Sequence, residues 1–68
     1  MNKPNWKDAP EWAMWLGIDA DGQCYWFSLK PELMNMWEWV TDGESADRKA
    51  AHAGDIGVDV NPYLEPRP

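Results

Sequence analysis

Cysteine, histidine and long apolar runs are scarce in this chain. Its 68 residues contain one Cys and one His. A single Cys forms no internal disulfide, and a structural metal site usually takes several Cys or His ligands, so the counts exclude both staples that commonly stabilise very small domains. No apolar stretch reaches the roughly 18 residues of a membrane span, and the residues after Met1 lead into no apolar run. The sequence therefore predicts neither a membrane span nor a secretory signal.

Basic residues are outnumbered by acidic ones. The chain carries twelve Asp or Glu and six Lys or Arg, a formal net charge of −6, and three of the six cations lie near its ends. Contacts to phosphates require clustered Lys and Arg, so this balance excludes direct nucleic-acid binding. It favours a basic partner, although solubility alone also explains an excess of acid. The unpaired Cys24 fits a reducing cytoplasm.

Tryptophan is present in excess. Six Trp occur in 68 residues, and one large aromatic side chain buries about 150–250 Å². A core built from Trp compensates for a length at which a single core supplies only about 3–5 kcal/mol of net stability, and self-association is the other route. We therefore expect one small domain over residues 1–68, monomeric or homodimeric, with irregular tails at residues 1–5 and 62–68.

The first half of the chain predicts a β-hairpin. Residues 12–18 are apolar with large side chains at alternating positions, which favours a strand over a seven-residue helix. Residues 19–22 read D-A-D-G, and a three-residue loop with Gly22 in the left-handed conformation predicts a bulged hairpin. The returning strand covers residues 23–28, and Pro31 ends it because proline lacks the amide donor of a sheet ladder.

The second half predicts a third strand and a helix. Residues 31–34 suit one helical turn with proline at its first position, and residues 36–41 alternate like a strand. Ser45 is the expected N-cap of a helix over residues 46–53, and residues 56–60 alternate like a fourth, edge strand. The expected fold class is α+β: a three- to four-stranded antiparallel sheet, arranged as a meander, with one short helix.

In such a meander the first and third turns fall at the same end of the sheet. This predicts four carboxylates on one rim, namely Asp19, Asp21, Asp42 and Glu44. Such a rim imitates the spaced charges of a nucleic-acid backbone, or clamps Arg and Lys side chains of a partner. Ordinary turn chemistry is the alternative, because Asp and Gly are the residues that hairpin loops favour. The acids that extend the predicted binding surface are Asp47, Asp55 and Asp59.

Both faces of the predicted sheet are apolar. The bulged loop puts Trp15 on the face opposite to that of Leu16, together with Tyr25 and Phe27. One short helix covers a single face, so either the C-terminal segment wraps the other face or an aromatic patch stays exposed for a partner. Trp15 and Trp37 are the candidate apolar anchors, and burial of all six Trp in the core is the alternative. A platform that stacks carbohydrate is a third use of the same patch.

Signatures of catalysis, metal binding and cofactor binding are weak. The pattern Asp19-x-Asp21-Gly22 lacks the further oxygen ligands and the terminal Glu of a calcium loop. His52 has no second ligand at helical spacing, and Cys24 has no neighbouring base or cation in the sequence to activate it. No glycine-rich phosphate loop occurs. The sequence predicts no enzymatic activity, no metal and no cofactor.

Several short motifs are combined along this chain. The run W-K-D-A-P-E-W-A at residues 6–13, the turn at 19–22 and the Y-W-F at 25–27 resemble a loose family of small tailed-phage proteins with the pattern W-x-x-A-P-x-W-A, D-x-D-G and Y-W-[FY]. Residues 63–68 resemble the family's usual ending, L-E-x-R-P. The resemblance implies a phage or prophage protein in the bacterial host cytoplasm and a shared fold, with no defined activity. The chain departs from the pattern at residues 44–54.

Small acidic phage proteins resemble one another in strategy, since several inhibit a host enzyme by occupying its nucleic-acid groove, anti-CRISPR proteins among them. By that analogy we expect an acidic phage-encoded inhibitor of a host nucleic-acid-binding defence protein, an anti-CRISPR that acts by DNA charge mimicry. The alternative is a non-enzymatic structural or protein-interaction module that uses an exposed Trp-rich face. A steep loss of affinity with added salt distinguishes the first from the second.

Overall fold

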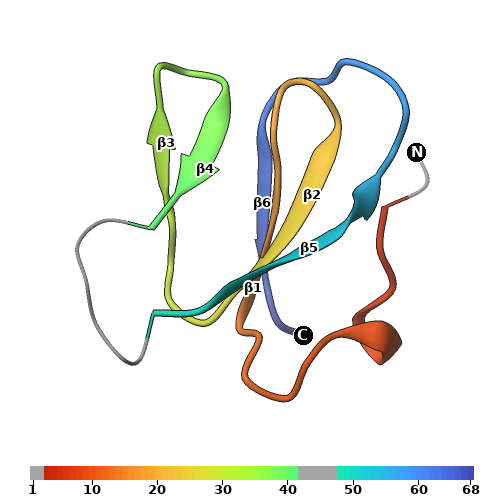
Figure 1. Cartoon of the computed structure of the whole chain (residues 1–68), viewed down its shortest axis with the longest axis vertical. Coiled ribbons are helices and arrows are strands. Elements are labelled where there is room, and N and C mark those ends of the chain that lie inside the picture. The colour runs from red at the N-terminus through yellow and green to blue at the C-terminus, as the bar shows by residue number, and fades with distance from the viewer. Residues whose placement is uncertain (1–2, 42–47) are drawn as a thin grey trace.

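The structure of the protein is a computed structural model that describes residues 3–41 and 48–68, and β-strands dominate it (Figure 1). In chain order the elements are the 3₁₀ turn η1 (Trp6–Asp8) and the strands β1 (Trp15–Ile18), β2 (Gln23–Phe27), β3 (Glu32–Met34), β4 (Glu38–Val40), β5 (Ala50–Asp55) and β6 (Tyr63–Pro66). An antiparallel sheet has the order β5-β2-β1-β6, and β3 pairs with β4 in a separate sheet. Within these residues no helix is long and apolar enough to cross a membrane. The fold is small and mostly β.

The predicted hairpin of the first half is confirmed as β1 and β2. The Gly22 amide donates to the Asp19 carbonyl at 2.9 Å, and the Asp19 amide donates to the Gln23 carbonyl at 2.9 Å. Gly22 has a left-handed φ of 89°, a region that favours glycine because it has no Cβ. The first strand begins at Trp15 rather than at residue 12.

The core lies on one face of the main sheet. Leu16 pairs with Trp26, and Ile18 pairs with Cys24, and all four side chains are buried. The ring of Trp6 packs on that of Trp26 with centroids 4.8 Å apart. The segments before β1 and after β5 therefore help to cover this face, in place of the expected helix. The partly buried residues that pack against the core are Trp6, Ala9, Trp12, Ala53, Ile56, Val60 and Tyr63.

The helix predicted over residues 46–53 is wrong where the structure describes it, because Ala50–Asp55 is strand β5. Residues 46 and 47 lie outside the described residues. β5 pairs antiparallel with β2, with a register shift between Cys24 and Tyr25. An isolated helix of eight residues is marginal in water, whereas the edge of β2 offers a ladder of hydrogen bonds. Tertiary pairing thus overrides the helix propensity of alanine.

Two expectations for the last part of the chain are also wrong. Residues 56–60 form no strand, and Tyr63–Pro66, expected in an irregular tail, is strand β6 paired with β1. The amides of Ile56 and Val60 donate to carbonyls of the β1–β2 turn at 3.0 and 2.9 Å, so the alternation at 56–60 reflects contacts with that turn. β6 lies at a sheet edge, where a proline such as Pro66 is tolerated because one side of the strand needs no ladder donor.

The predicted meander is wrong because the strand expected at residues 36–41 does not join the main sheet. The expected helical turn at residues 31–34 is strand β3, and the strand expected at 36–41 is β4, which pairs with β3 and not with β2. Residues 35–37 connect them, and Asn35 and Met36 in this loop have left-handed φ values of 53° and 63°. Two successive left-handed residues form the mirror-image turn whose twist suits that of the flanking strands of a hairpin. A local turn thus replaces pairing with the main sheet.

Trp39 fastens the β3–β4 hairpin to β1, and the two sheets stand side by side (Figure 1). Trp39 Nε1 donates to the Ile18 carbonyl at 3.2 Å, and the Trp39 amide donates to Asp19 Oδ1 at 2.8 Å. The indole lies over Gly17, where an added Cβ would come within 3.0 Å of Trp39 Cδ1 and 2.9 Å of Phe27 Cε2. The missing side chain of Gly17 therefore makes room for both rings.

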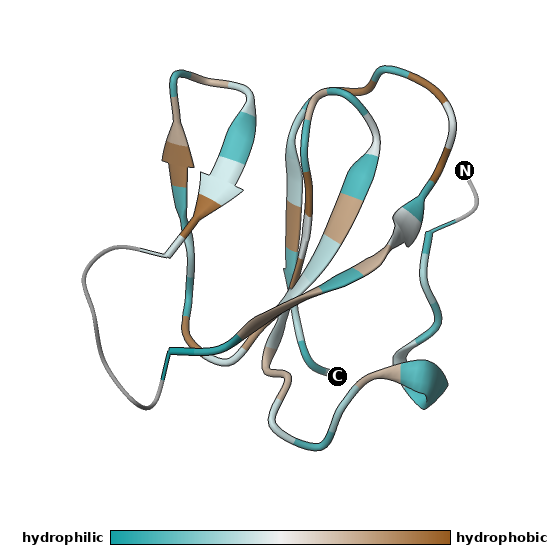
Figure 2. Cartoon of the chain, viewed as in Figure 1, coloured by the Kyte–Doolittle hydropathy of each residue, from teal (hydrophilic) through white to brown (hydrophobic). Residues whose placement is uncertain are grey.

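Large apolar side chains also lie outside the core. Figure 2 shows hydrophobic residues along β3, away from the main sheet. Met36, at the tip of the hairpin, is 84% exposed. The β3–β4 hairpin therefore presents an apolar surface to solvent. The exposed apolar residues of this hairpin are Leu33, Met34, Met36 and Trp37.

Candidate functional site

Acidic residues gather at the end of the main sheet where β1 turns into β2. The register sets Asp55 of β5 beside Gln23, the first residue of β2. The hydrogen bond from the Trp39 amide to Asp19 brings the neighbouring Glu38 to the same end, and the segment after β5 is bonded to the β1–β2 turn. We call this surface the acidic end, and its members are Asp19, Asp21, Glu38, Asp55 and Asp59.

Most cations lie at the far end of the sheet. Lys30 Nζ lies 5.5 Å from the ring centroid of Trp15, the first residue of β1. Among residues 3–41 and 48–68 the single ion pair joins Lys3 Nζ to Glu65 Oε1 at 2.9 Å. The carboxylates of the acidic end therefore have no ion-pair partner in those ranges. The cations that flank the far ends of the strands are Lys30, Arg48, Lys49 and Arg67.

Asp19 is buried and positions the hairpin. It is 5% exposed. Its Oδ1 accepts the Trp39 amide at 2.8 Å, whereas its Oδ2 makes no hydrogen bond to the described residues. Burial raises the pKa of Asp19 above its ordinary value of 3.8; the Trp39 bond opposes this rise, and the charges of Asp21 and Glu38 add to it. The sequence predicts Asp19 as a member of an exposed rim, whereas the structure shows it buried.

We expect Asp19→Asn to change the pH dependence of stability. Asparagine keeps an oxygen acceptor for the Trp39 amide and has no titrating proton. The wild-type protein holds a proton on Asp19 more tightly when folded, so its stability rises as pH falls through the raised pKa, and this gain is complete below 3.8. Urea unfolding from about pH 7 to about pH 4 should show the wild type gaining free energy of unfolding relative to the variant. A constant difference over that range would contradict burial of the Asp19 charge.

Asp21, Asp55 and Asp59 are the exposed members of the acidic end. Asp21 Oδ1 accepts the Gln23 amide at 3.1 Å. Asp55 accepts the Gly57 amide at 2.7 Å and the side-chain amide of Gln23 at 2.8 Å. These bonds hold the carboxylates of Asp21 and Asp55 in place and still leave the groups open to solvent, so they are presented at low conformational cost.

The other predicted binding residues have mixed positions. Asp42, Glu44 and Asp47 lie outside the described residues. Trp15 is half-buried at the far end of the sheet, beneath a lysine ammonium group. Trp37 is 43% exposed on the β3–β4 hairpin. The two proposed aromatic anchors therefore belong to different regions of the molecule.

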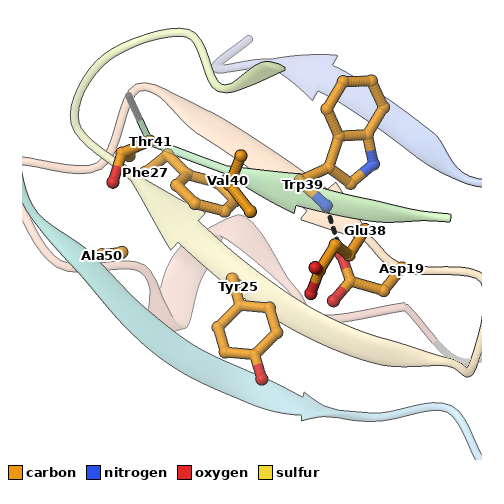
Figure 3. A pocket seen from close by; sticks show the side chains of 8 residues that line it. All are labelled: Asp19, Tyr25, Phe27, Glu38, Trp39, Val40, Thr41 and Ala50. Carbon is orange, nitrogen blue, oxygen red and sulfur yellow. Dashed lines mark hydrogen bonds between the residues drawn. The ribbon is translucent and has the colours of Figure 1, made fainter. Parts of the chain in front are cut away.

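A pocket of about 280 Å³ opens between β4 and the pair β2 and β5 (Figure 3). The rings of Tyr25 and Phe27 line it, with centroids 6.3 Å apart. The carboxylates of Asp19 and Glu38 point toward each other at one end of it (Figure 3). Burial raises the pKa of Tyr25, and the charges of Asp19, Asp21 and Glu38 raise it further, so the phenol stays protonated. The pocket combines aromatic surface with concentrated negative charge.

Glu38, Tyr25 and Phe27 are absent from the residues that the sequence predicts for binding. Glu38 lies between two Trp in a segment correctly expected to be a strand, and that alternation was the available signal. Its position beside Asp19 depends on how the hairpin docks, which no local pattern encodes.

The thiol of the main sheet is shielded. Cys24 is fully buried, and burial raises the pKa of its thiol, with the charges of Asp55 and Asp19 adding to the effect against a backbone hydrogen bond from Ile56. In the part of the chain that the structure describes, no group of three or more His, Cys, Asp or Glu side chains is arranged to hold a metal ion. The site described here offers charge, hydrogen bonds and aromatic surface.

Comparison with known proteins found no match: no family model, no curated protein and no solved structure matches this chain.

Proposed function

We propose that this protein binds a basic, nucleic-acid-binding protein through its acidic end and inhibits it by presenting carboxylates where DNA phosphates would lie. The separation of charge along the sheet supports this proposal, because exposed Asp21, Asp55 and Asp59 stand at one end and most cations at the other. The electrostatic field of this charge separation orients the protein toward a basic groove and speeds association. The target class favoured by the phage-protein resemblance is a host defence protein, a CRISPR effector in particular, in the host cytoplasm.

Charge reversal at the acidic end tests the proposal. We expect the triple variant Asp21→Lys, Glu38→Lys, Asp55→Lys to bind its target about 100-fold more weakly, at ~1 kcal/mol for each reversed charge. Circular dichroism should report an unchanged sheet, because these side chains are exposed or half-buried. Asp19 is kept, since a lysine in its buried position would lose the bond to Trp39. The target is first captured from a bacterial lysate on immobilised wild-type protein and identified by release with added DNA.

A matched variant separates local from total charge. The triple variant Asp8→Lys, Glu11→Lys, Glu32→Lys makes the same change in net charge at exposed positions outside the acidic end. It should keep most of the affinity, and affinity of the wild-type protein should fall steeply as salt is added. Equal losses in the two triple variants, or capture that DNA does not reverse, would contradict charge mimicry.

The exposed β3–β4 hairpin favours a second candidate function, a non-enzymatic structural or protein-interaction module. Trp37 and Met36 are 43% and 84% exposed, and Met36 is held with a left-handed φ of 63°, a conformation that is unfavourable for a residue with a side chain. Apolar contact through this hairpin would survive high salt. Binding that is insensitive to salt and lost in Trp37→Ser would favour this second function over the first.

A further inference from the structure

We propose that the pocket beside Asp19 binds the guanidinium group of an arginine side chain. This inference rests on the proposed function, because it names the side chain of the basic partner that the acidic end receives. The pocket volume of about 280 Å³ lies below the roughly 300–1,000 Å³ of small-molecule sites. A pocket of this size suits one long side chain of a partner rather than a cofactor.

The carboxylates supply the charge that arginine needs. Asp19 is about nineteen-twentieths buried, and its Oδ2 makes no hydrogen bond to the described residues while Oδ1 holds the Trp39 amide. Asp19 lines the pocket, and Figure 3 shows its carboxylate at the end of the pocket where Glu38 also lies. Glu38 adds a second carboxylate at the same end of the pocket. The described lining contains no Lys or Arg to neutralise the pair.

The half-buried ring of Tyr25 supplies a surface on which a guanidinium stacks. Tyr25 and Phe27 lie next to each other on one face of β2, with ring planes at 46° and centroids 6.3 Å apart. Phe27 is 3% exposed and backs the Tyr25 ring. A planar guanidinium lies flat on an accessible ring such as that of Tyr25 while its edge donates to carboxylates. Val40 extends this wall on the side of β4 (Figure 3), so the methylene groups of the ligand side chain also find apolar contact.

Arginine fits these groups better than lysine. Two carboxylates at one end of the pocket match the several donors of a guanidinium fork, whereas an ammonium group is a compact and strongly hydrated charge. Stacking on the Tyr25 ring also favours a planar cation. The same features disfavour anions, because an uncompensated pair of carboxylates repels them.

Peptide titration tests the pocket without the unidentified partner. The peptides are acetyl-Gly-Arg-Gly-amide and the same sequence with citrulline, which has the shape of arginine without its charge, or with lysine. Binding to ¹⁵N-labelled full-length protein is followed by amide chemical shifts. We expect saturable shifts at Asp19, Tyr25 and Trp39 with the arginine peptide. The citrulline and lysine peptides should bind at least about fivefold more weakly than the arginine peptide. Equal binding of all three peptides, or no saturable shift, would overturn the assignment.

Two variants link binding to the pocket. Glu38→Gln removes one carboxylate charge at a half-buried site and should weaken arginine binding about fivefold. Glu11→Gln makes the same chemical change at an exposed site outside the pocket and should leave the affinity unchanged. If both variants bind alike, binding reflects net charge and the pocket proposal fails.

The outcomes for the pocket and for the proposed function are distinct. Saturable arginine binding without any DNA-reversible target would support the pocket and count against charge mimicry of nucleic acid. A salt-sensitive, DNA-reversible target together with no arginine binding would support the acidic end and overturn the pocket.

Discussion

Replacing Trp26 with alanine is expected to unfold the protein. Trp26 is 4% exposed, pairs with Leu16 across β1 and β2, and packs on Trp6. Truncating a buried Trp costs about 3–5 kcal/mol of stability. One core in a domain of this length supplies a net stability of the same size, about 3–5 kcal/mol. Far-UV circular dichroism and amide dispersion in NMR spectra should both report loss of the sheet in Trp26→Ala.

Trp37→Ala is the matched control, because the same substitution is made where the side chain is 43% exposed. It should shift the urea midpoint only slightly. A cooperative unfolding transition of Trp26→Ala at the wild-type midpoint would show that the face carrying Leu16 and Ile18 is not the core.

The second large effect is expected from Gly17→Ala. A Cβ at this position would meet Phe27 Cε2 at 2.9 Å and Trp39 Cδ1 at 3.0 Å, so at least one of the two rings must move. Phe27 is 3% exposed within the sheet, whereas Trp39 belongs to the separate hairpin and is the freer of the two. Overpacking of this kind costs about 1–3 kcal/mol. We expect the hairpin to shift away from β1.

Two measurements on Gly17→Ala report on the stability of the protein and on the packing of the candidate site. Urea unfolding should show the loss, and the Trp39 amide and indole signals should move as their bonds to Asp19 and Ile18 weaken. The double variant Gly17→Ala, Phe27→Leu should recover part of the stability, because leucine ends before the clashing ring atom. Wild-type stability and unchanged Trp39 signals in Gly17→Ala would contradict the packing of the hairpin on β1.

The parts of the fold that the sequence predicted correctly have local causes. The hairpin follows from Gly22 after two turn aspartates and from the alternation that sets Leu16 and Trp15 on opposite faces. Residues 46–53 were predicted as a helix because alanine propensity is also local, but the partner of β5 is a strand more than twenty positions away, as in the pair Tyr25 and His52. Propensity cannot report a hydrogen-bonding partner at that distance.

The candidate site was predicted in the same partial way. The sequence predicts Asp21 and Asp55 as surface acids, and they lie at one end of the sheet, although the meander behind the predicted rim is wrong. Glu38 was missed because its place depends on the contact between Gly17 and Trp39. Asp19 was expected on the surface because turn aspartates usually are, and here it is buried by the hairpin that it holds.

The pairing of β6 with β1 has a consequence for how the chain folds. Residues 16 and 65 are neighbours in the sheet, so this edge of the sheet forms only after residues 63–66 have been made. Contacts this distant in sequence carry a large loop-closure cost and slow the search for the native state. We expect folding to occur as one cooperative event once residues 63–66 are available to pair with β1, with Leu16 and Trp26 open to chaperones until then.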